Sequence, residues 1–124
     1  MSERTKAEKG LELALRLTRG APPSVGMPEA FTKLTLEHVF GDIWQRPGLE
    51  LQERSLVTVT TLIATGREAE LRIHLNGALN LGIEREKLEA VLTHVAHYAG
   101  WPVAVSGFRV LEEVCAASEA GGDE

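Results

Sequence analysis

Cysteine is almost absent from the sequence, because Cys115 is the only one. One cysteine cannot form an intrachain disulfide, a Cys-x-x-Cys redox pair or a zinc site with several thiolates. Positive charge is also scarce: 13 lysines and arginines stand against 18 acidic residues, for a net charge of -5. No basic cluster interrupts this acidic balance, which argues against a general nucleic-acid binder. A small anionic molecule can still bind where a few arginines converge.

Long apolar runs are missing as well. No stretch reaches the roughly 20 residues that a membrane-spanning helix needs. The segment MSERTKAEKG at the N-terminus lacks the apolar core of a secretory signal. Aromatic residues make up only 5% of the chain, whereas hydrophobic residues make up 44% and charged residues 25%. This composition is typical of a globular protein, so we expect one cytoplasmic domain over residues 1–124 with no membrane partner.

Apolar residues recur at helical spacing through most of the chain, and glycine or proline separates the segments. The pattern predicts an all-α domain of about six helices with short connections. Residues 1–26 are expected to form an N-terminal helix and a loop, and the tail SEAGGDE at 118–124 is expected to fray. The predicted helices cover residues 3–19, 28–44, 51–65, 67–81, 84–99 and 102 onward.

The segment at 51–65 is the ambiguous one, because its valines, threonines and isoleucine favour a strand locally. Helical spacing of Leu56, Val59 and Ile63 favours a buried helix, whereas a strand would bury threonine beside charged neighbours. The same spacing predicts which residues of the other helices face inward. They are Leu11, Ala14, Leu15 and Thr18, then Phe31, Leu34, Val39 and Ile43, then Leu71, Leu75, Ala78 and Leu79, and finally Leu88, Val91, Leu92, Val95 and Tyr98.

A histidine stands beside the apolar stripe of the 67–81 segment. His74 follows Glu70 by one helical turn, so the two side chains share a face. A carboxylate at this distance favours the protonated imidazole. The pair can therefore serve general acid catalysis, for which the pKa of histidine is suited. The alternative is that His74 is a core-edge histidine bonded to a backbone carbonyl and Glu70 a solvated charge.

Four sequence blocks resemble the carboxymuconolactone decarboxylase family, which also includes the alkylhydroperoxidase D-like proteins. The blocks are W-x-R-P-G-L at 44–49, E-R-S-L at 53–56, G-R-E-x-E-L-R-x-H-x-x-G-A-L at 66–79 and Y-A-G-x-P at 98–102. They occur in the family's order, and the resemblance covers roughly residues 27–115.

The resemblance implies an all-α fold around a helical hairpin, assembled as a homo-oligomer such as a trimer or hexamer. The alkylhydroperoxidase D-like branch carries a Cys-x-x-Cys pair before its histidine, but Arg67 and Glu70 occupy those positions here. A disulfide relay needs two sulfurs, so the peroxidase chemistry is absent. The chain instead resembles the decarboxylase branch.

The resemblance implies a cofactor-independent lyase that acts on an unsaturated lactone such as γ-carboxymuconolactone. Loss of carbon dioxide leaves electrons that spread onto the lactone carbonyl as a dienolate, so no metal or organic cofactor is needed. His74 is then the expected proton donor, and Glu70 its partner. Two alternatives remain: a family enzyme adapted to cyclise or isomerise another metabolite, and a non-catalytic oligomeric binding protein.

Arginine suits substrate carboxylates, and Arg46, in the matched turn, is the first candidate. Arg54 is a second candidate, although it can equally pair with a glutamate. Arg72 lies on a different helical face from His74, which favours a surface or subunit contact. Trp44 is expected either to wall the pocket or to pack in the core.

Two further substrate-binding candidates, His94 and Tyr98, lie in the segment LTHVAHYAGWP. His94 stands where relatives often carry a polar residue, and Tyr98 can donate its hydroxyl to a substrate or simply pack. His94 and His97 can also be combined with His74 and Glu70 as metal ligands. We do not favour this metal site, because such spacing is common by chance and the family works without metal.

Overall fold

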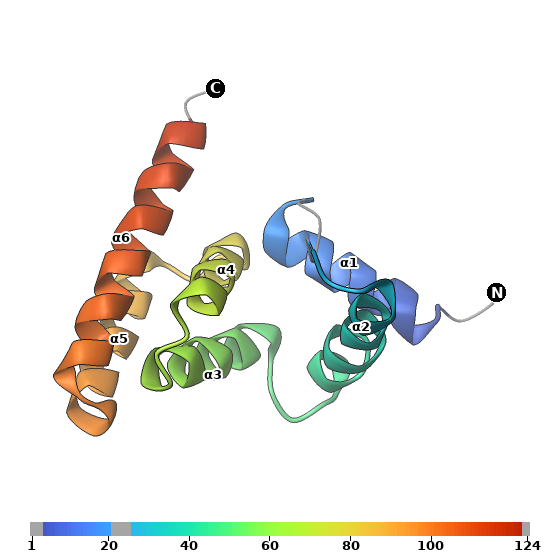
Figure 1. Cartoon of the computed structure of the whole chain (residues 1–124), viewed down its shortest axis with the longest axis horizontal. Helices are drawn as coiled ribbons and strands as arrows, with labels where there is room; N and C mark the ends of the chain where they lie inside the picture. Colours follow the sequence, from blue (N-terminus) through green and yellow to red (C-terminus); the bar gives the residue numbers. More distant parts are fainter. Residues whose placement is uncertain (1–3, 21–25, 123–124) are drawn as a thin grey trace.

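The computed structural model describes residues 4–20 and 26–122, and this part of the chain is helical without a strand (Figure 1). The all-α prediction is therefore confirmed. Six α-helices and two short irregular helices follow one another along the chain. Their bounds are α1 Lys6–Thr18, α2 Glu29–Leu34, the π-helix η1 Thr35–Phe40, the 3₁₀-helix η2 Ile43–Gln45, α3 Leu51–Ala64, α4 Glu68–Asn80, α5 Arg85–Ala99 and α6 Trp101–Gly122.

The ambiguous segment is a helix, α3, as predicted. Glu50 and Glu53 form a reciprocal capping box at its start, each side chain accepting the other's backbone N–H. Val59 and Ile63 are fully buried, one helical turn apart. Thr58 is one of the threonines that a strand would have buried; in the helix it is partly buried, and its hydroxyl donates to the carbonyl of Arg54 at 2.9 Å.

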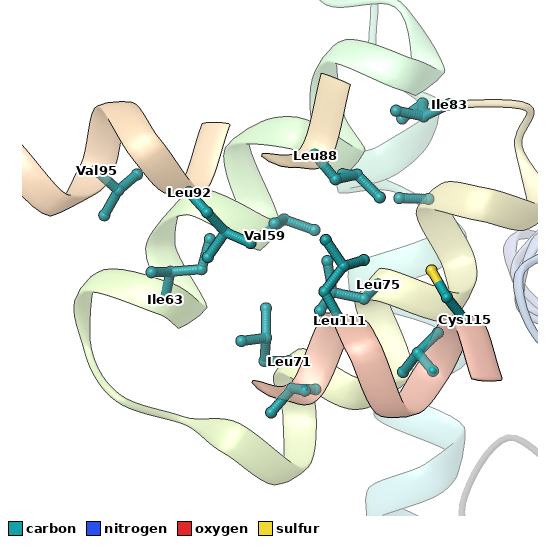
Figure 2. Close-up of a cluster of buried hydrophobic side chains, with 13 residues drawn as sticks. Val59, Ile63, Leu71, Leu75, Ile83, Leu88, Leu92, Val95, Leu111 and Cys115 are labelled. Atoms are coloured by element: carbon teal, nitrogen blue, oxygen red, sulfur yellow. The ribbon is translucent and has the colours of Figure 1, made fainter. Parts of the chain in front are cut away.

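Helices α3 to α6 surround the main hydrophobic core (Figure 2). Leu71 and Leu75 of α4 and Leu88 and Leu92 of α5 are at most 2% exposed, so the predicted stripes of these helices are largely confirmed. Tyr98 is the exception: it is 81% exposed, because α5 turns this position away from its contacts with α3 and α6. The other core residues are Val59, Ile63, Ala78, Ile83, Val95, Val110, Leu111, Val114 and Cys115.

A second, smaller core joins α1 to this helical group. Helix α1 packs on α4 and η1, and in Figure 1 it lies with α2 on the opposite side of α4 from α5 and α6. The cluster consists of Leu13, Leu17, Trp44 and Leu81, with Phe40 and Leu51 against it. The inner face of α1 is therefore displaced from the predicted one. Ala14 is buried as predicted, but Leu11 and Leu15 are exposed, and Leu13 and Leu17 are buried in their place.

Glycine explains this displacement of the α1 face. Gly10 is buried where α1 crosses η1, and a Cβ built on it would lie 1.8 Å from the Leu36 carbonyl oxygen. Gly41 makes the reciprocal approach, with its Cβ position 2.1 Å from the carbonyl oxygen of Lys6. The two backbones come into close contact at these glycines, so the residues on the same helical face as Gly10 are the ones that face inward, and Leu11 and Leu15 are not among them.

The predicted helix at 28–44 is divided into α2, η1 and η2, and its predicted inner face is wrong. Its four predicted inner residues Phe31, Leu34, Val39 and Ile43 are all exposed. Helix α2 packs mainly against η1 and has no buried residue. The π-helix that follows has a wider turn than an α-helix, which changes the face that later residues present.

The C-terminal helix α6 extends to Gly122, so residues 118–122 are its last turn, and 123–124 lie outside the described residues. The predicted loop at 20–26 also lies mostly outside them, since 21–25 are not described. None of the helices within the described part of the chain has the length and apolar character needed to cross a bilayer.

Candidate active site

His74 lies at the boundary between the two cores. It follows Leu71 on α4 by three residues and precedes the fully buried Leu75, so its ring is carried inward and is half-buried. A small cavity of about 50 Å³ adjoins it. The walls come from three parts of the chain: Ala14, Leu17 and Thr18 of α1, Thr32, Thr35, Leu36 and Phe40 of α2 and η1, and Ile73 beside His74 on α4.

The lining of this cavity is apolar apart from threonine and His74, and no lysine or arginine is among the described residues that form it. Its volume is well below the roughly 300–1,000 Å³ of typical small-molecule sites. It therefore fits one small group, such as a carboxylate, and not a complete lactone.

An aromatic stack supports the imidazole. The Trp44 and His74 rings are stacked, with centroids 6.3 Å apart and an interplanar angle of 23°. The Phe40 ring packs against the Trp44 ring, with their centroids 5.7 Å apart. Trp44 is thus buried in the smaller core and stacked on His74, but it is not among the residues that line the cavity, so its role as a wall of the substrate pocket stays a prediction.

Burial lowers the pKa of His74, and the negative charge of Glu70 opposes this shift only in part. The effect of Glu70 has the predicted direction, but desolvation is the larger cause. Glu70 itself is exposed on the first turn of α4. Burial therefore favours the neutral imidazole in the free protein, and a bound anion beside it would raise its affinity for a proton.

The arginines considered for substrate carboxylates do not line this cavity. Arg46 is exposed and its Nε donates to Asp42 Oδ1 at 3.1 Å, which lowers the pKa of Asp42. Arg54 reaches back to the turn, where its Nη2 donates to the Arg46 carbonyl at 2.7 Å. Arg72 pairs with Glu113 and so links α4 to α6 at the surface.

His94 and Tyr98 lie together on the outer face of α5, with ring centroids 4.9 Å apart, and neither lines the cavity. His97 is exposed nearby; its Nδ1 lies 2.8 Å from the Thr93 carbonyl oxygen, and its ring packs edge-on against Trp101. The structure does not bring these side chains to His74. Within residues 4–20 and 26–122, no three histidine, cysteine or acidic side chains are grouped so as to hold a metal ion.

A model of the carboxymuconolactone decarboxylase family matches residues 29–113, which is more than half of the chain. The chain belongs to this family. The match lies within the 27–115 region in which the sequence blocks resemble the family, so that prediction is confirmed.

Two relatives of the chain are named as decarboxylases. The chain is 39% identical over 84 residues to a 4-carboxymuconolactone decarboxylase of Acinetobacter baylyi, covering 68% of this chain and 63% of that one. It is 33% identical over 81 residues to a nitrosuccinic acid decarboxylase of Metarhizium robertsii, covering 65% of this chain and 57% of that one. The chain thus spans less than two thirds of the length of these relatives.

Helix α1 lies outside the segment that the family model matches, yet it supplies three residues of the cavity wall beside His74. The sequence blocks also gave no indication of Thr35, Leu36 and Phe40, which the π-helix directs to the same cavity. The pair Gly10 and Gly41 is a trace of this arrangement in the sequence, because close backbone contact at these two positions requires glycine. In this family member, the surroundings of His74 therefore come partly from outside the family segment.

Proposed function

We propose that the protein is a cofactor-independent decarboxylase, a carboxy-lyase, in which His74 delivers the proton that replaces carbon dioxide. The observation that carries this proposal is the half-buried imidazole at an otherwise uncharged cavity, in a family whose named relatives include two decarboxylases. The expected substrate is an unsaturated lactone acid such as γ-carboxymuconolactone.

The uncharged lining suits this reaction. A carboxylate that enters the cavity loses its water, and among the lining residues only His74 can offset its charge. Loss of carbon dioxide then moves the electron pair of the breaking carbon–carbon bond into the ring and onto the carbonyl oxygen. A spread charge is less destabilised by an apolar wall than a localised carboxylate is, so the cavity favours the transition state over the bound acid.

His74 takes up and then delivers the proton that this reaction needs. The neutral imidazole takes a proton as the anionic substrate binds, because the nearby negative charge raises its pKa. After carbon dioxide leaves, the imidazolium transfers this proton to a carbon of the dienolate and becomes neutral again. The net reaction consumes one proton from solvent. Glu70, whose charge already raises the pKa of His74, supports the charged state of the ring.

The two relatives point to a substrate class broader than one lactone. In γ-carboxymuconolactone the electrons flow to a lactone carbonyl, and in nitrosuccinic acid a nitro group can receive them. Both acids therefore carry an electron-accepting group that is connected, directly or through a double bond, to the carbon that loses carbon dioxide. A family enzyme adapted to cyclise or isomerise another metabolite, or a binding protein without catalysis, remains the alternative, and the turnover measured below distinguishes them.

A homo-oligomer, such as a trimer or hexamer in the cytoplasm, is part of the proposal. Large apolar side chains lie exposed on α5 and α6: Tyr98 is 81%, Trp101 63% and Phe108 37% exposed. Burial of such side chains between copies would be favourable. Assembly is also the route by which Arg46, Arg54, His94 or Tyr98 of a second copy can contact substrate that extends from the cavity mouth.

The test is carbon dioxide release from three acids by the intact protein in metal-free buffer. The acids are γ-carboxymuconolactone, nitrosuccinic acid and the saturated counterpart of the lactone, which lacks the electron-accepting double bond. We expect release from the lactone, and one solvent deuterium in the product formed in heavy water. Absence of turnover with both activated acids, or equal release from the saturated acid, would refute the proposed chemistry.

A further inference from the structure

A second hollow is lined in part by Trp44, whose ring also stacks on His74. It is a groove of about 310 Å³ between α1 and the chain around η2 and the start of α3. This volume is at the lower limit of small-molecule sites, at ~300 Å³. Nothing in the mechanism proposed above uses this groove.

Three cations of the N-terminal segment, Arg4, Lys9 and Arg16, line the groove. Arg4 forms an ion pair with Glu12, the acidic residue in the lining, so these two charges offset each other. Lys9 and Arg16 have no carboxylate partner among the residues that the structure describes. They are seven residues apart on α1, so two helical turns place both charges along one face.

The floor of the groove between these charges is apolar and aromatic. Leu13, which lies between Lys9 and Arg16 on the same face of α1, is buried, as is the Trp44 indole. Leu51 at the start of α3 completes this floor, and Gln45 adds a polar amide. An apolar floor below two unpaired cations matches a ligand that has an apolar body and an anionic end.

We propose that this groove binds an aromatic or alkyl carboxylate, at a site distinct from the His74 cavity. Lys9 and Arg16 hold the carboxylate, and the body of the ligand lies against Trp44, Leu13 and Leu51. The two sites share Trp44, since the same indole lines the groove and stacks on His74. Trp44 fluorescence therefore responds to occupancy of the groove without any turnover, and a His74 variant separates this response from one at the cavity.

Benzoate titrated into a Trp101→Phe background, in which Trp44 is the only indole, tests the site. We expect a saturable change in Trp44 fluorescence, no such change with the neutral analogue benzamide, and binding weakened on the order of tenfold or more when Lys9→Gln and Arg16→Gln are combined. The matched control combines Lys87→Gln and Arg109→Gln, which remove the same charge from exposed positions on α5 and α6 and should leave the titration unchanged.

His74→Gln in the same background separates this site from the cavity. Binding that persists in His74→Gln supports a distinct groove, whether or not the protein proves to be a decarboxylase. No saturable benzoate signal, equal binding of benzamide, equal loss in the control pair, or loss of binding in His74→Gln would each overturn the proposal. Far-UV circular dichroism of every variant establishes that the helices are retained.

Discussion

Replacement of Gly10 by alanine should undo the contact that shapes the cavity. The added Cβ would lie 1.8 Å from the Leu36 carbonyl oxygen, whereas ordinary contacts begin at 3.4 Å. The obstacle is backbone on both sides, so no side chain can rotate away and α1 must move from η1. Overpacking of this kind costs about 1–3 kcal/mol and occasionally more, and the better helix propensity of alanine returns at most ~1 kcal/mol. We therefore expect a net loss of about 1–2 kcal/mol in the free energy of unfolding.

Gly77→Ala is the matched control, because Gly77 is also a buried helical glycine that faces the α1–α4 contact. Its Cβ would meet the Leu17 side chain at 3.4 Å, an ordinary contact, so the gain in helix propensity should leave stability equal or slightly higher. Urea unfolding followed by circular dichroism gives both free energies, and Trp44 fluorescence in a Trp101→Phe background reports whether α1 has left its cluster. Equal stability and equal Trp44 signals for the two variants would refute the backbone contact.

Three further predictions concern the imidazole and the exposed face. Because burial lowers the pKa of His74, the unfolded chain binds the imidazole proton more tightly than the folded protein does. The free energy of unfolding should therefore fall as the pH drops below the ordinary imidazole pKa of about 6.5. Urea titrations should show a smaller fall for His74→Gln. An equal pH dependence in both proteins would count against a desolvated ring. Glu70→Gln should lower the pKa of His74 further in an NMR titration, whereas Glu68→Gln should change it less, and the reverse order would contradict the role given to Glu70. Trp101→Ser should shift sedimentation of the protein toward the monomer if the α5–α6 face joins copies, and an unchanged oligomer would remove that face from the interface.

The main core was predictable because its helices are ordinary ones. In α4 and α5 the apolar residues follow helical spacing, and Leu71, Leu75, Leu88 and Leu92 are buried as predicted. Helical spacing also predicted α3 correctly, although its β-branched residues favour a strand: Val59 and Ile63 are buried one helical turn apart. In these segments, local pattern and tertiary packing point to the same face.

The N-terminal third was less predictable, because its faces depend on contacts between backbones. Leu11 and Leu15 compete with Leu13 and Leu17 for the inner face of α1, and only the close approach at Gly10 decides between the two stripes. A π-helix has no simple sequence signal, so the direction of Leu36 and Phe40 toward the cavity was out of reach.

The candidate site was predictable only in part, for a related reason. Spacing along one helix brings Glu70 near His74, and the turn block brings Trp44 there, but the walls from α1 depend on tertiary contacts. Burial also dominates the pKa of His74, and burial cannot be judged from neighbours in the sequence. The roles of Arg46, Arg54, His94 and Tyr98 in substrate binding stay predictions, because none of them lines the cavity of its own chain.

The most direct test of the central claim is the rate of carbon dioxide release from γ-carboxymuconolactone by His74→Gln relative to the unmodified protein. His97→Gln on the exposed face of α5 serves as the control histidine variant. If His74 delivers the proton, its replacement should lower the turnover rate by about 10² to 10⁴ while His97→Gln retains it. A His74→Gln protein that releases carbon dioxide as fast as the unmodified one would contradict the account.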